Sequence, residues 1–271
     1  MDGMKDFLGL AGKRVLVTGV ANQKSVAAHV ARILLDAGAH VALSVRDEAA
    51  RLRAEELFPG LPTHLCDVER DGDIRRLAQE VSAGGAPLQG FLHCLAFANY
   101  AGGLKPFHET LRADFMQAMD IGMFSLVALS RALAPALDPD ASVVALSIST
   151  TSTAAASYGY MAPVKAALDS AIPFMAKSFS AFSRVRFNAV CAGPLKTSAS
   201  AGIPGYLDNY LYAEMATFRH RALETPEVAR LAAFLLSPAS SGMNGGCHKV
   251  DAGMGSNFFD EAIVRKATRD A

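Results

Sequence analysis

Seven short apolar runs, rich in β-branched residues, alternate with longer stretches of helical periodicity, and this alternation most constrains the fold. The runs are Arg14–Thr18, His40–Val45, Thr63–Cys66, Gly90–Leu95, Ser142–Ile148, Val185–Cys191 and Cys247–Val250. The helical patterns are Ser25–Ala37, Glu48–Phe58, Asp73–Val81, Arg112–Leu137, Ala155–Phe182 and Pro226–Leu236. Continuously apolar strands are typical of sheets buried on both faces. The pattern therefore predicts a doubly wound, seven-stranded parallel sheet with helices on both faces, a Rossmann-type α/β fold.

Length and composition fit one such domain over residues 1–271. Apolar residues make up 51% of the chain and charged residues 19%, enough to bury a large core, and no repeat or linker divides it. The formal net charge is zero, so we expect neither a nucleic-acid partner nor an anionic membrane surface. The sequence contains no run of about 18 uncharged apolar residues, so we expect no membrane span. Widely spaced cysteines indicate reduced thiols in a cytoplasmic protein, and no histidine spacing indicates a metal site.

The first strand runs directly into a turn and a helix, the arrangement that binds a pyrophosphate. The turn reads Thr18-Gly-Val-Ala-Asn-Gln-Lys-Ser25-Val26. Backbone N–H groups and the positive end of the helix dipole meet there, and Ser25 can cap the helix or contact a phosphate oxygen. Only Gly19 remains of the usual glycine fingerprint. On pattern alone this is therefore a weak match to a nucleotide-binding turn.

Two further strand ends carry residues suited to the adenosine part of a dinucleotide. Asp67, in Cys66-Asp67-Val68, can accept from an adenine amino group or be an ordinary strand-end aspartate. Arg46 follows the second strand, where an NAD-selective site usually has an acid, and a guanidinium suits a 2′-phosphate. The adjacent Asp47 and Glu48 weaken that inference. We therefore favour NADPH and keep NADH as the alternative.

Tyr158 and Lys165 are seven residues apart, in Tyr158-Gly-Tyr-Met-Ala-Pro-Val-Lys165. On a helix this spacing places both near one face. A phenol there can hydrogen-bond a developing oxyanion, while an ammonium holds a ribose and lowers the phenol's pKa. The alternative is two residues on a partly buried helix. Tyr160, five residues before Lys165, is rotated away from it and is interpreted as a packing residue.

The segment Lys196–Arg221 interrupts the alternation. It is polar, aromatic and broken by Pro204 and Gly205. Such a segment is typical of a lid over a site, the alternative being a surface loop without a role.

Taken together, these residues resemble the short-chain dehydrogenase/reductase superfamily, and within it the divergent bacterial enoyl-[acyl-carrier-protein] reductases of the FabI type. The resemblance covers about Leu10 to Phe259. Its most specific element is Tyr158-x6-Lys165, with Met161 where the ordinary Tyr-x3-Lys spacing requires tyrosine. Its other elements are the nucleotide turn, Cys66-Asp-Val68, His93-Cys-Leu-Ala-Phe-Ala98, Asn188-Ala-Val-Cys-Ala-Gly-Pro194, Thr197 and Val250-Asp-Ala-Gly253.

The resemblance implies NAD(P)H-dependent reduction of a trans-2-enoyl thioester, carried by acyl carrier protein or coenzyme A, in a homotetramer. Tyr158 would hydrogen-bond the thioester carbonyl and Lys165 the nicotinamide ribose. The lid would span residues 195–221. Further implied cofactor contacts are Gly19, Val20, Ala21, Ser25, Val26, Asp67, Val68, Leu95, Ala96, Gly193, Pro194, Leu195 and Thr197. Implied substrate contacts, besides Tyr158, are Phe97, Ala98, Met161, Ala199 and Ile203.

The sequence departs from the family pattern at several positions. Ile148 replaces a second tyrosine that is often found there, and Ala96 replaces a glycine near the nicotinamide. These departures keep two alternatives open: a reductase of a specialised-metabolite enone or carbonyl, and a nucleotide-binding homologue without catalysis. Pro173 is expected to kink the helix that carries Lys165. The charged segment Asp260–Ala271 is expected to be a solvated tail.

Overall fold

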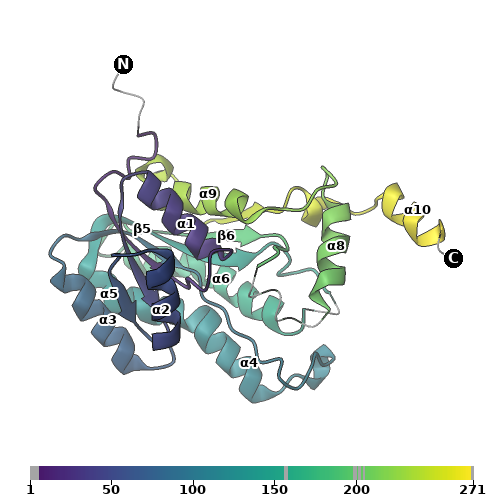
Figure 1. Ribbon diagram of the computed structural model, residues 1–271, viewed down its shortest axis with the longest axis horizontal. Coiled ribbons are helices and arrows are strands. Elements are labelled where there is room, and N and C mark those ends of the chain that lie inside the picture. Colours follow the sequence, from purple (N-terminus) through teal and green to yellow (C-terminus); the bar gives the residue numbers. More distant parts are fainter. Residues whose placement is uncertain (1–5, 156–157, 198–199, 201–202, 204, 270–271) are drawn as a thin grey trace.

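The computed structural model describes residues 6–155, 158–197, 200, 203 and 205–269. Seven parallel strands form one sheet in the order β3-β2-β1-β4-β5-β6-β7, which confirms the predicted fold class (Figure 1). The strands are β1 Arg14–Thr18, β2 His40–Val45, β3 Thr63–Leu65, β4 Leu88–His93, β5 Leu137–Ile148, β6 Arg186–Ala192 and β7 Cys247–Val250. The order reverses between β1 and β4, and such a switch point opens a crevice at the carboxyl ends of the strands.

Helices cover both faces of the sheet, each with its own apolar cluster. One face carries α1 (Val26–Asp36), α2 (Glu48–Leu57) and α9 (Thr225–Leu236). The opposite face carries α3 (Asp71–Ala83), α5 (Ser125–Leu133) and α6 (Met161–Phe179).

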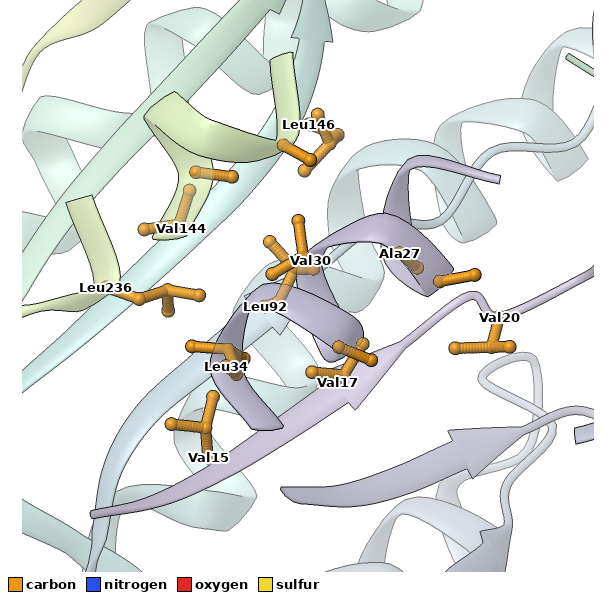
Figure 2. Packing of buried hydrophobic residues seen from close by; sticks show 14 of the residues in the cluster. Val15, Val17, Val20, Ala27, Val30, Leu34, Leu92, Val144, Leu146 and Leu236 are labelled. Atoms are coloured by element: carbon orange, nitrogen blue, oxygen red, sulfur yellow. The ribbon is translucent and has the colours of Figure 1, made fainter. Parts of the chain in front are cut away.

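The first cluster fixes α1 against the strands that lead to the nucleotide turn. Ala27, Val30 and Leu34 of α1 point towards Val17 of β1 and Leu92 of β4 (Figure 2). Burying each large aliphatic side chain contributes roughly 1.5–3 kcal/mol. The start of α1 is thereby held at the carboxyl end of β1.

The predicted long helix over Arg112–Leu137 is composite. It consists of α4 (Arg112–Met119), a π-helical turn (Asp120–Phe124), α5 and a 3₁₀ turn (Ala134–Ala136). A Cβ on Gly122 would lie 2.9 Å from Cγ1 of Val164 in α6, so the π-helical turn approaches α6 closely. Among the described helices, Arg112–Ala136 is long and apolar enough to cross a membrane, but 44% of its most apolar window is buried in the protein.

Two other segments differ from expectation. α6 begins at Met161, six residues later than predicted, and runs without a break through Pro173. Part of the expected tail forms α10 (Glu261–Arg269), where Glu261 and Arg265 pair one turn apart at 3.0 Å. This helix lies at the end of the molecule beyond α8 (Tyr206–Ala216) (Figure 1).

Candidate active site

A cavity of about 1010 Å³ opens at the carboxyl ends of the strands. Every predicted site residue within the described part of the chain lines it, whereas Ala199 lies outside the described residues. The predicted residues that share this cavity are Gly19, Val20, Ala21, Ser25, Val26, Arg46, Asp67, Val68, Leu95, Ala96, Phe97, Ala98, Tyr158, Met161, Lys165, Gly193, Pro194, Leu195, Thr197 and Ile203. The fold thus brings the set together, and the individual ligand contacts stay predictions.

The turn between β1 and α1 approaches β4 very closely. Gly19 has φ 84°, and a Cβ there would overlap the carbonyl oxygen of Cys94. Ser25 caps α1 by accepting from the Ala28 N–H at 3.3 Å, and its hydroxyl donates to the Asn22 carbonyl at 2.7 Å. Ser25 therefore satisfies the helix, while the remaining N–H groups of the first turn suit an anion.

Two guanidinium groups line the cavity beyond the end of β2. Arg46 pairs with Asp47 at 2.9 Å, and its side chain is 64% exposed. Arg53 lines the same wall. Asp67 is already engaged: it accepts from the Glu69 N–H at 3.2 Å and pairs with Arg70 at 3.3 Å. This end of the cavity thus presents the guanidinium groups of Arg46 and Arg53 beside the carboxylates of Asp47, Asp67 and Glu69.

Lys165 is buried beneath the cavity floor, with 5% of its surface exposed. Its Nζ donates to the carbonyl oxygens of Leu146 at 2.8 Å and Leu95 at 3.1 Å, so it joins the ends of β5 and β4. Burial lowers the pKa of Lys165 to about 8, against the opposing influence of Cys94, Asp169 and Cys191. Two carbonyl acceptors leave one ammonium N–H for a ligand hydroxyl.

Tyr158 does not lie on the helix that carries Lys165, and that prediction is wrong. It stands in a turn before α6, where Gly159 has φ 55°. The predicted lowering of its pKa by Lys165 is also wrong. Burial, with Tyr206 and Tyr100 nearby, raises the pKa of Tyr158 above its ordinary value. The phenol is therefore protonated at neutral pH and is available as a hydrogen-bond donor.

The neighbouring phenols have different surroundings. Tyr160 is buried, accepts from the Asn99 N–H at 2.9 Å and packs edge-on against Phe115, which confirms a packing role. Tyr100 lines the cavity, and its buried hydroxyl meets no partner among the described residues.

His93 and the thiols near the cavity belong to the core. The His93 Nε2 lies 2.7 Å from the Ser125 hydroxyl, and burial lowers the pKa of His93 to about 3. Burial also raises the pKa of the Cys94 thiol to about 11. Both shifts are those of buried groups, which is typical of core residues.

The segment predicted as a lid contains α8, which forms one wall of the cavity. Tyr206 binds the loop after β6 through two hydrogen bonds. Its hydroxyl accepts from the Leu195 N–H and donates to the Leu195 carbonyl, both at 2.9 Å. Sequence reasoning assigned no role to the cavity residues of α8, because their positions depend on where that helix starts. These residues are Tyr206, Asn209, Tyr212 and Ala216.

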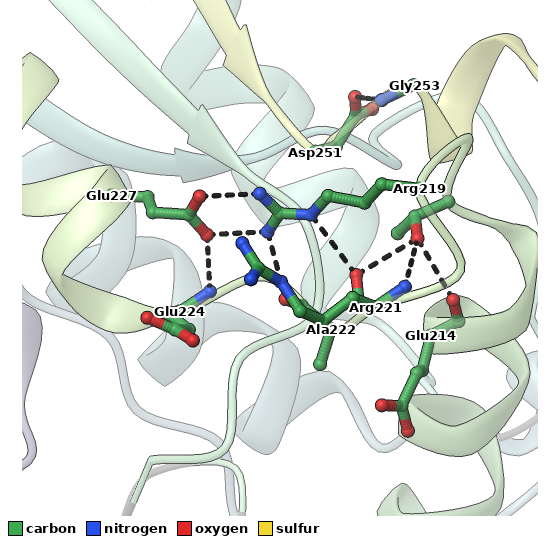
Figure 3. Close-up of polar contacts among 9 residues, drawn as sticks. Glu214, Arg219, Arg221, Ala222, Glu224, Glu227, Asp251 and Gly253 are labelled. Atoms are coloured by element: carbon green, nitrogen blue, oxygen red, sulfur yellow. Dashed lines mark hydrogen bonds and ion pairs between the residues drawn. The ribbon is translucent and has the colours of Figure 1, made fainter.

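An ion pair anchors the end of this segment to α9. Arg219 binds both carboxylate oxygens of Glu227 at 2.6 Å and donates to the Ala222 carbonyl at 2.9 Å (Figure 3). Glu227 also accepts from the Glu224 N–H at 2.8 Å and so completes the cap of α9. The hydrogen bond from Arg219 lowers the pKa of Glu227 to about 2.

Glu227→Gln is therefore expected to lower the free energy of unfolding at pH 7 by about 1 kcal/mol. A carboxylate whose pKa is depressed stabilises the fold above its unfolded pKa of 4.5, and this stability is lost as the pH falls towards about 2. The difference between wild type and variant should consequently shrink across that window. Denaturant unfolding at a series of pH values measures it, and a difference independent of pH would contradict the assignment.

Comparison with known proteins places these features in a family. A profile described as enoyl-(acyl carrier protein) reductase matches residues 19–255. The enoyl-[acyl-carrier-protein] reductase [NADH] FabI of Nostoc is 35% identical over 253 residues, 91% of this chain and 98% of the relative. The corresponding [NADPH] protein of Staphylococcus aureus is 30% identical over 252 residues, 91% of this chain and 98% of the relative.

A solved structure agrees in fold. FabI from Candidatus Liberibacter asiaticus superposes with a TM-score of 0.88 at 28% identity, covering 93% of this chain and 98% of that one. The profile spans more than half of the sequence, and the nucleotide turn, Tyr158 and Lys165 share one cavity. The chain belongs to the enoyl-(acyl carrier protein) reductase family.

Proposed function

We propose that the protein reduces the trans-2 double bond of an enoyl thioester carried by acyl carrier protein, with NADPH or NADH as the reductant. The observation that carries this proposal is the cavity that joins the β1–α1 turn, the buried Lys165 ammonium and the Tyr158 phenol. Relatives named as enoyl-[acyl-carrier-protein] reductases, with NADH or with NADPH, support it.

The residues fit a dinucleotide along the switch-point crevice. The turn at Gly19 and the first turn of α1 would hold the pyrophosphate, and Lys165 would hold the nicotinamide ribose through its remaining N–H. The reduced nicotinamide supplies a hydride when bound. Addition of a hydride to the β-carbon would place negative charge on the thioester carbonyl oxygen of the substrate, where Tyr158 would donate a hydrogen bond, and protonation of the α-carbon would complete the reduction. The raised pKa of Tyr158 keeps its proton in place for this role.

Turnover of enoyl thioesters tests the proposal. Oxidation of NADPH and NADH is followed with trans-2-enoyl thioesters of acyl carrier protein and of coenzyme A, beside a panel of ketones and free enones. Reduction of enoyl-acyl carrier protein, with saturated thioester as product, is expected. Turnover of ketones alone would favour the specialised reductase, an alternative kept open by the departures at Ile148 and Ala96, although Ile148 offers no hydroxyl to assist carbonyl reduction. Cofactor binding without any turnover would favour a non-catalytic homologue.

The preference for NADPH is expected to depend on Arg46. A charge-assisted contact to the 2′-phosphate is worth roughly 1.5–3 kcal/mol, about ten- to a hundredfold in affinity. Arg46→Ala should therefore lower kcat/KM for NADPH by at least tenfold and leave the value for NADH nearly unchanged. Steady-state kinetics with both cofactors measures this change.

Arg51→Ala is the matched control. Arg51 pairs with Glu48 and Glu55 on α2 and does not line the cavity, so neither cofactor should be affected. A clear preference of the wild type for NADH would overturn the Arg46 argument.

We further infer a cytoplasmic homotetramer. Large apolar side chains lie exposed on the helical surface formed by α4, the π-helical turn and α6, where Met116, Phe124 and Phe174 are 54%, 49% and 74% exposed. Burying such a surface against a second copy would remove it from water. Light scattering coupled to size exclusion tests the assembly, and a monomeric mass would contradict it.

A further inference from the structure

Three potential metal ligands from three different elements converge beside α6. They are Asp169 of α6, Cys191 of β6 and Cys247 of β7, and their ligand atoms lie within 4.8 Å of one another. Cys247 pairs in register with Ala189, and Cys191 pairs with Lys249. Both cysteines therefore project from the same face of the sheet, the face that α6 covers. The two cysteines are 56 positions apart in the sequence, so the sequence alone gives no sign that they are close.

Pro173 leaves the backbone carbonyl of Asp169 without its usual helical donor, beside the same three ligands. In a regular α-helix the Asp169 carbonyl accepts from the N–H of residue 173, and proline has none. The Cys247 sulfur lies 3.6 Å from this carbonyl oxygen and the Cys191 sulfur 3.8 Å from Oδ1 of Asp169. The proline in mid-helix thus frees an acceptor that holds the exposed Cys247 next to Asp169.

A buried hydroxyl lies beside the three ligands as well. Ser147 of β5 pairs in register with Cys191 and is 4% exposed. Its hydroxyl interacts with the Asp169 carboxylate and the Cys191 sulfur. Ser147 also lines the cavity at the carboxyl ends of the strands, so the cluster lies directly behind the cavity wall.

We propose that Asp169, Cys191 and Cys247 bind a divalent cation of the zinc class. Two thiolates and one carboxylate suit Zn²⁺, which imposes no geometry of its own and is four-coordinate in most protein sites. Bond lengths of about 2.0–2.3 Å bring tetrahedral ligands to within about 4 Å of each other, so small side-chain rotations close the site. Solvent on the Cys247 side supplies the fourth position.

Such a cation would tie α6 to the edge of the sheet. β7 has only four residues, and Asp169 lies one helical turn after Lys165. Crosslinking α6, β6 and β7 therefore stabilises the helix that carries Lys165 without entering the cofactor crevice.

Cobalt and zinc titrations of the reduced full-length protein test the proposal. One Co²⁺ per chain should bind with a sulfur-to-cobalt charge-transfer band and the intense visible bands of tetrahedral cobalt. Zn²⁺ should displace it and release about two protons, because both thiols must ionise. Zn²⁺ should also raise the melting temperature, with the stabilisation growing as the logarithm of its free concentration above Kd.

Variants of the three residues test whether they are the ligands of the bound cation. Cys247→Ser should weaken the charge-transfer band, because one of the two thiolates is lost, and should weaken Zn²⁺ binding by at least tenfold. Because Cys247 is exposed, the variant should fold. Asp169→Asn provides the second variant. Cys66→Ala, which removes a thiol outside the cluster, should bind as wild type does. Octahedral or absent cobalt bands, equal affinity in Cys247→Ser, or a Cys191–Cys247 disulfide in the native protein would overturn the proposal.

Discussion

Tyr158→Phe is expected to lower kcat for enoyl-thioester reduction by about 10²–10³-fold while cofactor affinity stays nearly unchanged. In the mechanism that we propose, the phenol donates to the oxygen on which charge develops, and burial keeps it protonated. Phenylalanine retains the ring and its packing but removes the donor. The loss should therefore appear in the chemical step and not in cofactor binding, as measured by single-turnover kinetics and by calorimetry.

Tyr160→Phe is the matched control for this experiment. Both tyrosines flank Gly159, but the hydroxyl of Tyr160 is bonded to Asn99 and faces the packed side. Its removal should cost about 1 kcal/mol of stability and leave kcat within a factor of a few. Equal losses in the two variants would assign the effect to the fold. A fully active Tyr158→Phe would remove the phenol from the mechanism and leave Tyr100, which also lines the cavity, as a donor to test.

The sheet was predictable because inner strands such as β1, β4 and β6 are buried on both faces and therefore read as continuous apolar runs. β1, β2 and the more exposed β7 have the predicted bounds. Helix starts were less predictable. A helix from Ala155 would need an N–H from Pro163 in its interior, whereas a start at Met161 places Pro163 in the first turn, where no N–H is needed. Tyr158 consequently lies in a turn.

The convergence of the site residues followed from topology, since parallel strands deliver their carboxyl ends to one edge of the sheet. Contacts that depend on strand register or on the placement of a loop helix did not follow. The proximity of Cys191 to Cys247 depends on the register between β6 and β7. The hydrogen bonds between Tyr206 and Leu195 depend on the position of α8. Neither leaves a periodic signal in the sequence.

Gly19→Ala is expected to destabilise the protein by about 3–5 kcal/mol and to weaken cofactor binding by more than about tenfold. Two costs add at this position. A side chain at φ 84° is strained by about 1–2 kcal/mol, and the added Cβ overlaps the carbonyl oxygen of Cys94, which is backbone and cannot rotate away. The β1–α1 turn must therefore move, and the predicted pyrophosphate contacts move with it.

Gly60→Ala separates the two costs. Gly60 has nearly the same φ, 81°, but an added Cβ meets no atom within 4 Å. This variant should lose only the strain of about 1–2 kcal/mol and bind cofactor as wild type does. Denaturant unfolding and cofactor titration of both variants measure the difference. Equal losses of stability and equal cofactor affinities in the two variants would mean that the close approach of Gly19 to β4 does not shape the β1–α1 turn. Larger losses of stability and of affinity in Gly19→Ala would mean that this approach holds the turn in place for the pyrophosphate.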